Sequence, residues 1–415
     1  NIVAPYLESI EANLFLNWTN LRFLYLPKVT VFRQHAFQQC YGLYQIVIEN
    51  LCEIQQCALQ YCFSLSHINL RNVEILEGLN GGFSLQLAHF QKLKKLGEFE
   101  ATSGIYYLNC DNLTSDSINT LQKSNSIQFI RSTNKYIKTE HMVFVSPDSS
   151  TRQREDNIVV QNGFPTFQEL QNIRENAIQN IHQLKEPWIL TKAGALLSNQ
   201  LEIPISLKNI RGLVLSNVKE ITDSQFADFG CLIFFYGFKV TKIGARGFYF
   251  CRSLRTVLCR QLKYVGDKAF YGCTSLTKIF LKNAETVGER CFGCCQSLVE
   301  CELGCFELAN YQFERCYALQ KVVAQRAHNI GLLAFSECNT VHITADPNAC
   351  TELAKSQKLI VNQNYRFQEV LCYKFNERAR FKRMAFKQFD LCRQLDVSLI
   401  FKLKVEFQIR FSAFK

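Results

Sequence analysis

The sequence predicts an α/β solenoid, in which strand-and-turn units stack so that their strands form a curved parallel β-sheet on the concave side, with short helices or 3₁₀ turns on the convex side. Two observations predict this class. A Phe is followed three residues later by a Cys five times in succession, with the Phe at positions 248, 270, 292, 313 and 335. After each Cys, apolar and variable residues alternate, as in a strand with one buried face. A fixed period of about 22 residues is typical of stacked repeat proteins.

The repeated Phe and Cys positions predict the core. One unit reads Val265, Phe270, Cys273, Leu276, Ile279, Leu281, and the same template recurs over residues 10–70. A single unit cannot bury its apolar face alone, so neighbouring units must stack. Trp18 and Phe229 stand in the Cys position, which indicates a buried site where a free thiol acts as a small hydrophobe. We expect these residues to form stacked core columns: Phe37, Cys40, Cys62, Phe248, Cys251, Phe270, Cys273, Phe292, Cys295, Phe313, Cys316, Phe335 and Cys338.

These units resemble the BspA-like leucine-rich repeats of microbial proteins, whose unit is close to Ile-x-x-x-Ala-Phe-x-x-Cys-x-x-Leu-x-x-Ile-x-Leu-Pro. Residues 268–276, Lys-Ala-Phe-Tyr-Gly-Cys-Thr-Ser-Leu, reproduce its centre, and Leu26 and Pro27 match its end. Clear matches cover residues 10–70 and 204–343. The resemblance implies a leucine-rich-repeat solenoid and says little about activity. Because some BspA-like proteins act in attachment, it also implies a cell-surface adhesin as an alternative function.

The repeat phase divides the chain into four parts: N-terminal repeats over 1–130, an irregular insert over 131–200, the main repeat block over 201–345, and degenerate basic repeats over 346–415. In the insert, the polar run 146–156 predicts a loop. Thr166 and Glu169 form a capping-box pair before an apolar stripe, which predicts a helix over 167–185, with a stretched repeat as the alternative. The chain begins with Asn1 and stops within a repeat-like stretch at 409–414, so we expect a piece of a longer protein.

The chain has 19 cysteines, which raises the questions of disulfides and of zinc. The densest cluster is Cys291, Cys294, Cys295, Cys301 and Cys305. The repeat phase places these thiols on different faces of one unit, whereas zinc needs four ligands around one point. Cys side chains in stacked units point in parallel, so a ladder of disulfides would be strained. We expect free core thiols and no metal, which favours a cytoplasmic location over the cell surface.

Charge and motifs limit the functional classes that remain. The net charge is +11, and residues 372–415 hold eleven Lys or Arg against four Asp or Glu. This segment predicts either a patch for nucleic acid or an anionic membrane surface, or the solvated face of a capping repeat, which we favour. No His-Glu-x-x-His motif or phosphate-binding glycine loop is present, so we expect no enzyme, no cofactor and no small-molecule substrate. No apolar run approaches the roughly 18 residues needed to cross a bilayer.

A non-catalytic solenoid acts through its surface. In each Leu-x-x-Ile-x-Leu segment, the variable positions point away from the core onto the concave sheet face, which solenoids use for extended binding. Aromatic side chains beside Arg and Lys are typical of protein interfaces, with a merely tolerated surface as the alternative. The predicted protein-binding residues are Arg22, Phe23, Tyr25, Tyr44, Gln45, Val47, Arg255, Thr256, Leu258, Thr277, Lys278, Phe280, Glu300, Glu302, Gln320 and Lys321.

Overall fold

The structure is a computed structural model that describes residues 1–78, 85, 87–98, 107–110, 129–131, 143–145, 188–190, 195–198, 201, 210–346 and 359–361. Residues 2–365 form one compact unit, and Asn1 with residues 366–415 forms a second, of which only Asn1 is described. We name the described residues of 2–98 the N-terminal block and residues 210–346 the C-terminal block. The predicted loop 146–156, the predicted helix 167–185 and the basic segment 372–415 lie outside the described residues.

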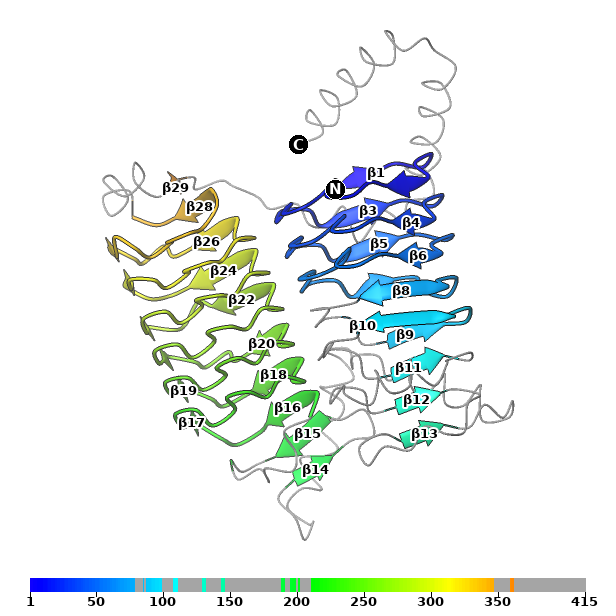
Figure 1. Ribbon diagram of the computed structural model, residues 1–415. Coiled ribbons are helices and arrows are strands. Elements are labelled where there is room, and N and C mark those ends of the chain that lie inside the picture. The colour runs from blue at the N-terminus through cyan, green and yellow to red at the C-terminus, as the bar shows by residue number, and fades with distance from the viewer. Residues whose placement is uncertain are drawn as a thin grey trace, which may run out of the picture. The chain divides into compact units, whose positions relative to one another are not determined.

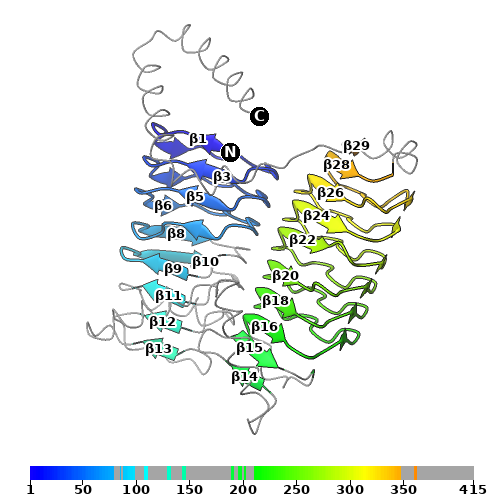
Figure 2. The same ribbon diagram turned by 180° about the vertical axis from the view of Figure 1, so that it is seen from behind.

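Both blocks are stacks of strands that pair in parallel (Figures 1 and 2). Each strand pairs with the equivalent strand one repeat away, as where Phe234 pairs with Thr256 and Lys278 with Glu300. Among the described strands, the one antiparallel pair is β14 (Trp188–Leu190) with β15 (Ala195–Ser198), and β15 then joins the main stack in parallel. The predicted parallel solenoid of stacked units is therefore confirmed.

The longer strands follow the Cys and Leu of each repeat. In the C-terminal block they form two consecutive hydrogen-bonded sheets. The first contains β16 (Gly212–Leu215), β18 (Phe234–Gly237) and β20 (Thr256–Leu258), and the second contains β22 (Lys278–Leu281), β24 (Glu300–Leu303), β26 (Lys321–Val323) and β28 (Val341–Thr344), extended by β29 (Leu359–Val361). We name these two sheets together the long-strand sheet. Their counterparts earlier in the chain are β1 (Ile2–Val3), β3 (Phe23–Tyr25), β5 (Gln45–Val47) and β7 (His67–Ile68), then β9 (Leu87–Phe90), β11 (Tyr107–Cys110), β12 (Phe129–Arg131) and β13 (Val143–Val145).

Each repeat also contributes a second, shorter strand that the sequence analysis did not predict. In the C-terminal block these form the short-strand sheet: β17 (Glu220–Ile221), β19 (Lys242–Ile243), β21 (Tyr264–Val265) and β23 (Thr286–Val287), with β25 (Glu307–Leu308) and β27 (Asn329–Ile330). In the N-terminal block they are β2 (Ser9–Ile10), β4 (Val31–Phe32), β6 (Glu53–Ile54), β8 (Ile75–Gly78) and β10 (Lys95–Glu98). An exposed residue before a buried apolar one, as in Tyr264 and Val265, is the only local signal of such a strand.

The segment around each Phe is a series of turns. The N–H groups of His35, Phe37 and Gln39 donate to carbonyls of the next repeat, whereas the intervening N–H groups donate to the carbonyl three residues back. Because every second N–H bonds to a neighbouring repeat, the N–H(i) to O(i−4) ladder of an α-helix cannot form. The part of the chain that the structure describes contains no helix, where the sequence analysis expected short helices or 3₁₀ turns. The bonds three residues back are the 3₁₀ feature that remains.

Those turns require left-handed backbone at fixed places. The residues two before and two after the repeated Phe have positive φ, for example 56° at His35, 62° at Gln39 and 54° at Lys268. Gly272 occupies one such position, with φ of 73°. Non-glycine residues adopt this conformation at a cost of about 1–2 kcal/mol each. The repeated hydrogen bonds to neighbouring repeats must therefore offset strain at about two residues per repeat.

The core consists of stacked columns, as the sequence predicts. The Phe248 and Phe270 rings are 5.4 Å apart and parallel within 1°, and Phe270 and Phe292 are 5.9 Å apart. The column continues to Phe313 and Phe335, and Phe15 stacks on Phe37 in the N-terminal block. Each buried Phe contributes roughly 1.5–3 kcal/mol through burial alone. Stacking thus supplies to each repeat the apolar contact that it lacks by itself.

One core expectation is wrong. Trp18, which was expected to be buried in the Cys position, is 51% exposed, while Phe229 in the same position is buried. Trp18 belongs to the first turn of the N-terminal block, and its ring packs edge-on against Phe15 at 5.1 Å. Among the described residues, no repeat turn with a central Phe stacks on the outer side of this one.

Candidate binding surface

The long-strand sheet of the C-terminal block carries most of the residues predicted for partner binding. On β22, β24 and β26, buried residues alternate with residues that face outward, because successive side chains of a strand point to opposite faces. Strand register sets the outward residues in two rows across the strands. The first row contains Lys278, Glu300 and Lys321, and the second contains Phe280, Glu302 and Val323. Thr256 and Leu258 occupy the equivalent repeat positions on β20.

The first row is charged and internally paired. The Glu300 carboxylate lies 3.6 Å from Lys278 Nζ and 3.1 Å from Lys321 Nζ, and Lys321 donates a hydrogen bond to it. All three side chains are at least two-thirds buried. Ion pairs near a surface contribute about 0–1 kcal/mol each, so their main effect is to fix the orientation of these side chains.

The second row is mostly apolar. The Phe280 side chain is 52% exposed on β22, and Leu258 at the equivalent repeat position of β20 is partly exposed. Thr256 is exposed, and Thr277 and Gln320 are partly exposed at the start of their strands. An exposed aromatic ring on a strand that is hydrogen-bonded into a sheet, as β22 is to β24, is a rigid apolar contact site.

The N-terminal block corrects part of the predicted surface. Phe23 is 2% exposed, and Arg22 and Tyr25 are also buried, so these three do not form a solvent-facing surface. The Arg22 guanidinium donates to the Gly42 carbonyl, and Gly42 has no side chain to keep Arg22 away. Arg22, Phe23 and Tyr25 all make further interactions within the protein. Strand alternation predicted which way they point but not what covers them.

The structure brings predicted residues of the two blocks together. The Arg255 guanidinium lies 5.3 Å from the centre of the Tyr44 ring, within range of a cation–π contact. Burial, and then the charge of Arg255, lower the pKa of His67. The Gln320 amide donates to Asn20 Oδ1 at 3.1 Å. Gln45 and Val47 on β5, and Tyr44 directly before it, are partly exposed.

Hydroxyl groups of the C-terminal block extend this contact between the blocks. Ser297 donates to the Tyr41 carbonyl at 2.9 Å, and Ser275 donates to the Phe63 carbonyl at 3.2 Å. Tyr41 also stacks on Tyr317, with 5.3 Å between ring centres. Along this contact, residue numbers increase in one block while they decrease in the other. The repeats of the two blocks therefore contact each other in antiparallel order. The sequence repeat alone gave no signal for this pairing.

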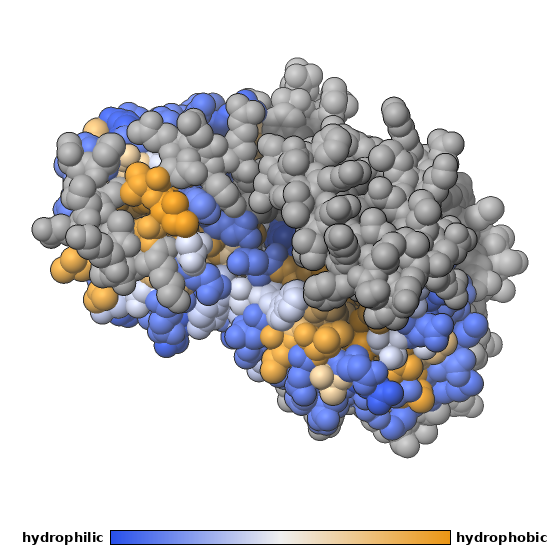
Figure 3. Space-filling view, turned by 90° about the horizontal axis from the view of Figure 1, so that it is seen from above, coloured by the Kyte–Doolittle hydropathy of each residue, from blue (hydrophilic) through white to orange (hydrophobic). Residues whose placement is uncertain are grey.

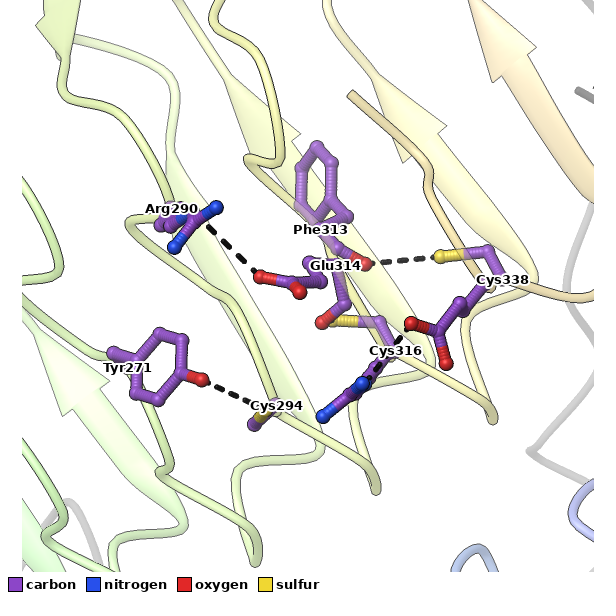
Figure 4. Close-up of polar contacts among 9 residues, drawn as sticks. Tyr271, Arg290, Cys294, Phe313, Glu314, Cys316 and Cys338 are labelled. Atoms are coloured by element: carbon purple, nitrogen blue, oxygen red, sulfur yellow. Dashed lines mark hydrogen bonds and ion pairs between the residues drawn. The ribbon is translucent and has the colours of Figure 1, made fainter. Parts of the chain in front are cut away.

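The repeated thiols have a role beyond filling space. Cys251 donates to the Phe226 carbonyl at 3.0 Å, and each equivalent Cys donates to the Phe carbonyl of the preceding repeat (Figure 4 shows Cys338 and Phe313). Cys40, Cys62, Cys273, Cys295 and Cys316 do the same. Burial raises the pKa of Cys40 and of Cys338 to about 12. These thiols therefore stay protonated, as hydrogen-bond donors, at neutral pH.

The cysteines of the cluster that resembled a metal site differ in exposure. Cys291, Cys295, Cys301 and Cys305 are buried free thiols, whereas Cys294 is partly exposed and donates to the Tyr271 hydroxyl at 3.3 Å (Figure 4). Within the described ranges, no group of three or more His, Cys, Asp or Glu side chains converges on a point that could hold a metal ion. No helix of those ranges has the length and apolarity to span a membrane.

Sequence reasoning missed two outward rows. Tyr236 on β18 is in register with Leu258 and is partly exposed, and the alternation from buried Phe235 could have identified it. On the short-strand sheet, Glu220, Lys242 and Tyr264 form a row of cross-strand neighbours, in which Lys242 Nζ lies 3.6 Å from Glu220 and 5.9 Å from the Tyr264 ring centre. This row was missed because its strands were not predicted.

Apolar side chains are also exposed at the ends of the repeat stacks. Leu14, Leu16 and Trp18 are exposed in the first turn, and Leu332 and Leu333 are exposed in the repeat of Phe335. In an end-on view, apolar areas are separated by hydrophilic ones on the described surface (Figure 3). The interrupted pattern sets these residues apart from the ordered rows of the long-strand sheet.

Comparison with protein families gives one match. Residues 8–139 and 241–357, more than half of the chain, match the BspA type leucine rich repeat region, in six copies. Among curated proteins, no sequence matches this chain.

Solved structures with similar chains share low sequence identity with this protein. The pneumococcal vaccine antigen PcpA is 15% identical, with 86% of this chain and 85% of that chain covered and a TM-score of 0.36. A leucine rich cell surface protein from Faecalibacterium prausnitzii A2-165 is 14% identical, with 86% and 87% covered and a TM-score of 0.25. A leucine rich repeat protein of T. pallidum is 18% identical, with 41% and 90% covered and a TM-score of 0.27.

Proposed function

Because the chain belongs to the family of BspA-type leucine-rich-repeat proteins, we propose that it is a non-enzymatic scaffold that binds a protein partner on the long-strand sheet of the C-terminal block. The observation that carries the proposal is the exposed Phe280 ring on β22, beside a paired row of charged side chains. Aromatic anchors with polar neighbours carry most of the binding energy in protein interfaces.

The rigidity of the sheet supports this proposal. Parallel register holds Lys278, Glu300 and Lys321 at strand spacing, and the shared carboxylate of Glu300 restricts both lysines. A surface that is ordered before binding loses little conformational entropy when a partner docks. The same residues are therefore suited to recognition of a partner surface over several strands.

The thiols support a non-catalytic role. A nucleophilic cysteine reacts as the thiolate, and its pKa is lowered by nearby positive charge or by a helix N-terminus. Burial instead raises the pKa of Cys40 and Cys259 to about 12, and it also raises the pKa of Cys273 and Cys295. These thiols are suited to packing and to hydrogen bonding.

The test compares two exposed aromatic residues on the two sheets of the C-terminal block. The full chain, with Phe280→Ala or with Tyr264→Ala, is immobilised and used to retain partners from an extract of the source cells, which are identified by mass spectrometry. Tyr264 is 42% exposed on β21 and serves as the matched control. We expect Phe280→Ala to lower retention of specific partners at least tenfold and Tyr264→Ala to leave it unchanged. Equal retention by both variants, or loss only with Tyr264→Ala, would contradict the proposal.

A further inference from the structure

Phe280 and Glu302 are cross-strand neighbours that both face outward. They lie in register on β22 and β24, where side chains of paired residues are about 4.5–5.5 Å apart at Cβ. Phe280 is 52% exposed, and Glu302 is partly exposed. Within the described residues, no Lys, Arg or His nitrogen lies within 4.0 Å of the Glu302 carboxylate, because Lys278 and Lys321 both pair with Glu300.

A carboxylate and an aromatic ring also hold a cation elsewhere in the chain. On the short-strand sheet, Lys242 lies between the carboxylate of Glu220 and the ring of Tyr264, its neighbours on the two adjacent strands. The two attractions act together on one ammonium group. The carboxylate neutralises its charge, and the ring face offers negative electrostatic potential.

A second example holds a guanidinium. Arg290 lies 4.6 Å from the centre of the Tyr311 ring, and its Nε is 3.7 Å from the Glu314 carboxylate (Figure 4 shows Arg290 and Glu314). An aromatic ring and a carboxylate thus hold one basic side chain between them at two separate places in this block. Phe280 and Glu302 present the same two groups without such a side chain among the described residues.

We propose that Phe280 and Glu302 form a subsite for a basic side chain, Arg foremost, of the protein partner. The proposal rests on the proposed function, because it identifies what the long-strand sheet recognises. Arg fits better than Lys because its planar guanidinium can stack on the Phe280 ring while its N–H groups donate to both oxygens of Glu302. Its aliphatic stem can lie along Val323, the apolar neighbour of Glu302 in the row.

Because the chain has a net positive charge, this subsite does not attract every cation at long range. The chain carries +11, so long-range electrostatics repel a basic peptide. Binding must therefore come from the local pair of ring and carboxylate. An acidic peptide is the opposite case, since the net charge attracts it and Glu302 repels it.

The experiment uses the full chain and fluorescein-labelled hexa-arginine as the probe, with hexa-lysine, hexa-citrulline and hexa-glutamate as comparison peptides, in fluorescence anisotropy titrations at about 0.15 M salt. Citrulline keeps the shape of Arg without its charge. The variants are Phe280→Ala and Glu302→Gln. The matched control is Glu307→Gln, which makes the same charge change at an exposed carboxylate on β25, where Arg326 already lies 4.1 Å from the ring of Phe306.

We expect hexa-arginine to bind more tightly than hexa-lysine and hexa-citrulline. A cation–π contact and an ion pair each contribute about 0.5–1 kcal/mol, so Phe280→Ala and Glu302→Gln should each weaken hexa-arginine binding by about two- to fivefold. Glu307→Gln should change it less than 1.5-fold. Equal effects of Glu302→Gln and Glu307→Gln, or binding of hexa-citrulline as tight as that of hexa-arginine, would overturn the subsite.

The outcome is separable from that of the proposed function. If Phe280→Ala abolishes partner retention while Glu302→Gln and excess hexa-arginine leave it unchanged, the sheet binds its partner without a basic anchor, and the subsite proposal is wrong. If hexa-arginine binds as expected but Phe280→Ala leaves partner retention unchanged, the subsite stands as a peptide-binding site and the broader function is wrong.

Discussion

Replacement of Cys251 tests whether the repeated thiols act as hydrogen-bond donors or only as apolar filling. Cys251 is fully buried, and its thiol donates to the Phe226 carbonyl at 3.0 Å. Among the described residues, no other donor to that carbonyl is present. The informative series is Cys251→Ser, which keeps a donor, Cys251→Ala, which removes the donor and the sulfur, and Cys251→Val, which fills the space without a donor.

Two contributions set the expected loss of stability: the removed sulfur atom and the lost hydrogen bond. Removing a buried sulfur resembles removing one methylene-sized group, which costs about 1 kcal/mol. Loss of the hydrogen bond adds about 0.5–1.5 kcal/mol, because the Phe226 carbonyl remains buried. We therefore expect Cys251→Ala to lower the free energy of unfolding by about 2 kcal/mol and Cys251→Ser by about 1 kcal/mol. Cys251→Val, which fills the space but has no donor, should lose only the hydrogen-bond contribution of about 1 kcal/mol.

The assay is urea unfolding of the full chain under reducing conditions, followed by circular dichroism, with midpoints compared only where the slope is unchanged. The control is Cys52→Ala, because Cys52 is an exposed free thiol, and we expect a change below about 0.5 kcal/mol. A Cys251→Ser variant less stable than Cys251→Ala would refute the donor role. So would a Cys251→Ala variant as stable as Cys52→Ala.

Three further predictions concern the turns and the contact between the blocks. Gly272→Ala should destabilise the chain by about 1–3 kcal/mol in urea unfolding, because φ is 73° and an added Cβ would clash with the Phe250 ring. Lys268→Gly should instead stabilise it by up to about 1 kcal/mol in the same assay, since Lys268 has φ of 54°; a loss of stability would contradict the strain argument. His67, whose pKa is lowered by burial and by Arg255, favours its neutral form in the folded state, so its contribution to stability is present above its unfolded pKa of about 6.5 and is lost as pH falls through the folded pKa. In NMR titration, Arg255→Gln should raise the pKa of His67, and an unchanged pKa would show that Arg255 has no part in the shift.

The columns of the core could be predicted because the repeat fixes them. Once Phe248, Phe270 and Phe292 recur at one period, stacking places them over one another whatever the local backbone does. The backbone of the turns could not be predicted in the same way. Apolar residues three apart fit a short helix and a series of turns equally well. The hydrogen bonds of His35 and Phe37 to the next repeat decide between them, and they exist only after stacking.

The candidate binding surface could also be predicted only in part. Alternation along β22 and β24 correctly placed Lys278, Phe280 and Glu300 on the outer face. It also placed Phe23 there, but the structure buries that ring. A pattern of period two gives the face of a sheet on which a side chain lies, and not which other part of the chain covers that face. Such burial depends on contacts between residues far apart in sequence, for which a single sequence carries no signal.

The hydrogen bonds that exclude a helix also order the proposed binding surface. Because N–H groups of each turn bond to the next repeat, the turns and the strands share one register from repeat to repeat. The spacing of Phe280 and Glu302 is therefore set by pairing of β22 with β24, and not by a flexible loop. A partner that docks there meets side chains already held at strand spacing, so its binding energy is not reduced by ordering of the scaffold. A change in a turn, such as Lys268→Gly, should consequently alter stability while leaving hexa-arginine binding unchanged.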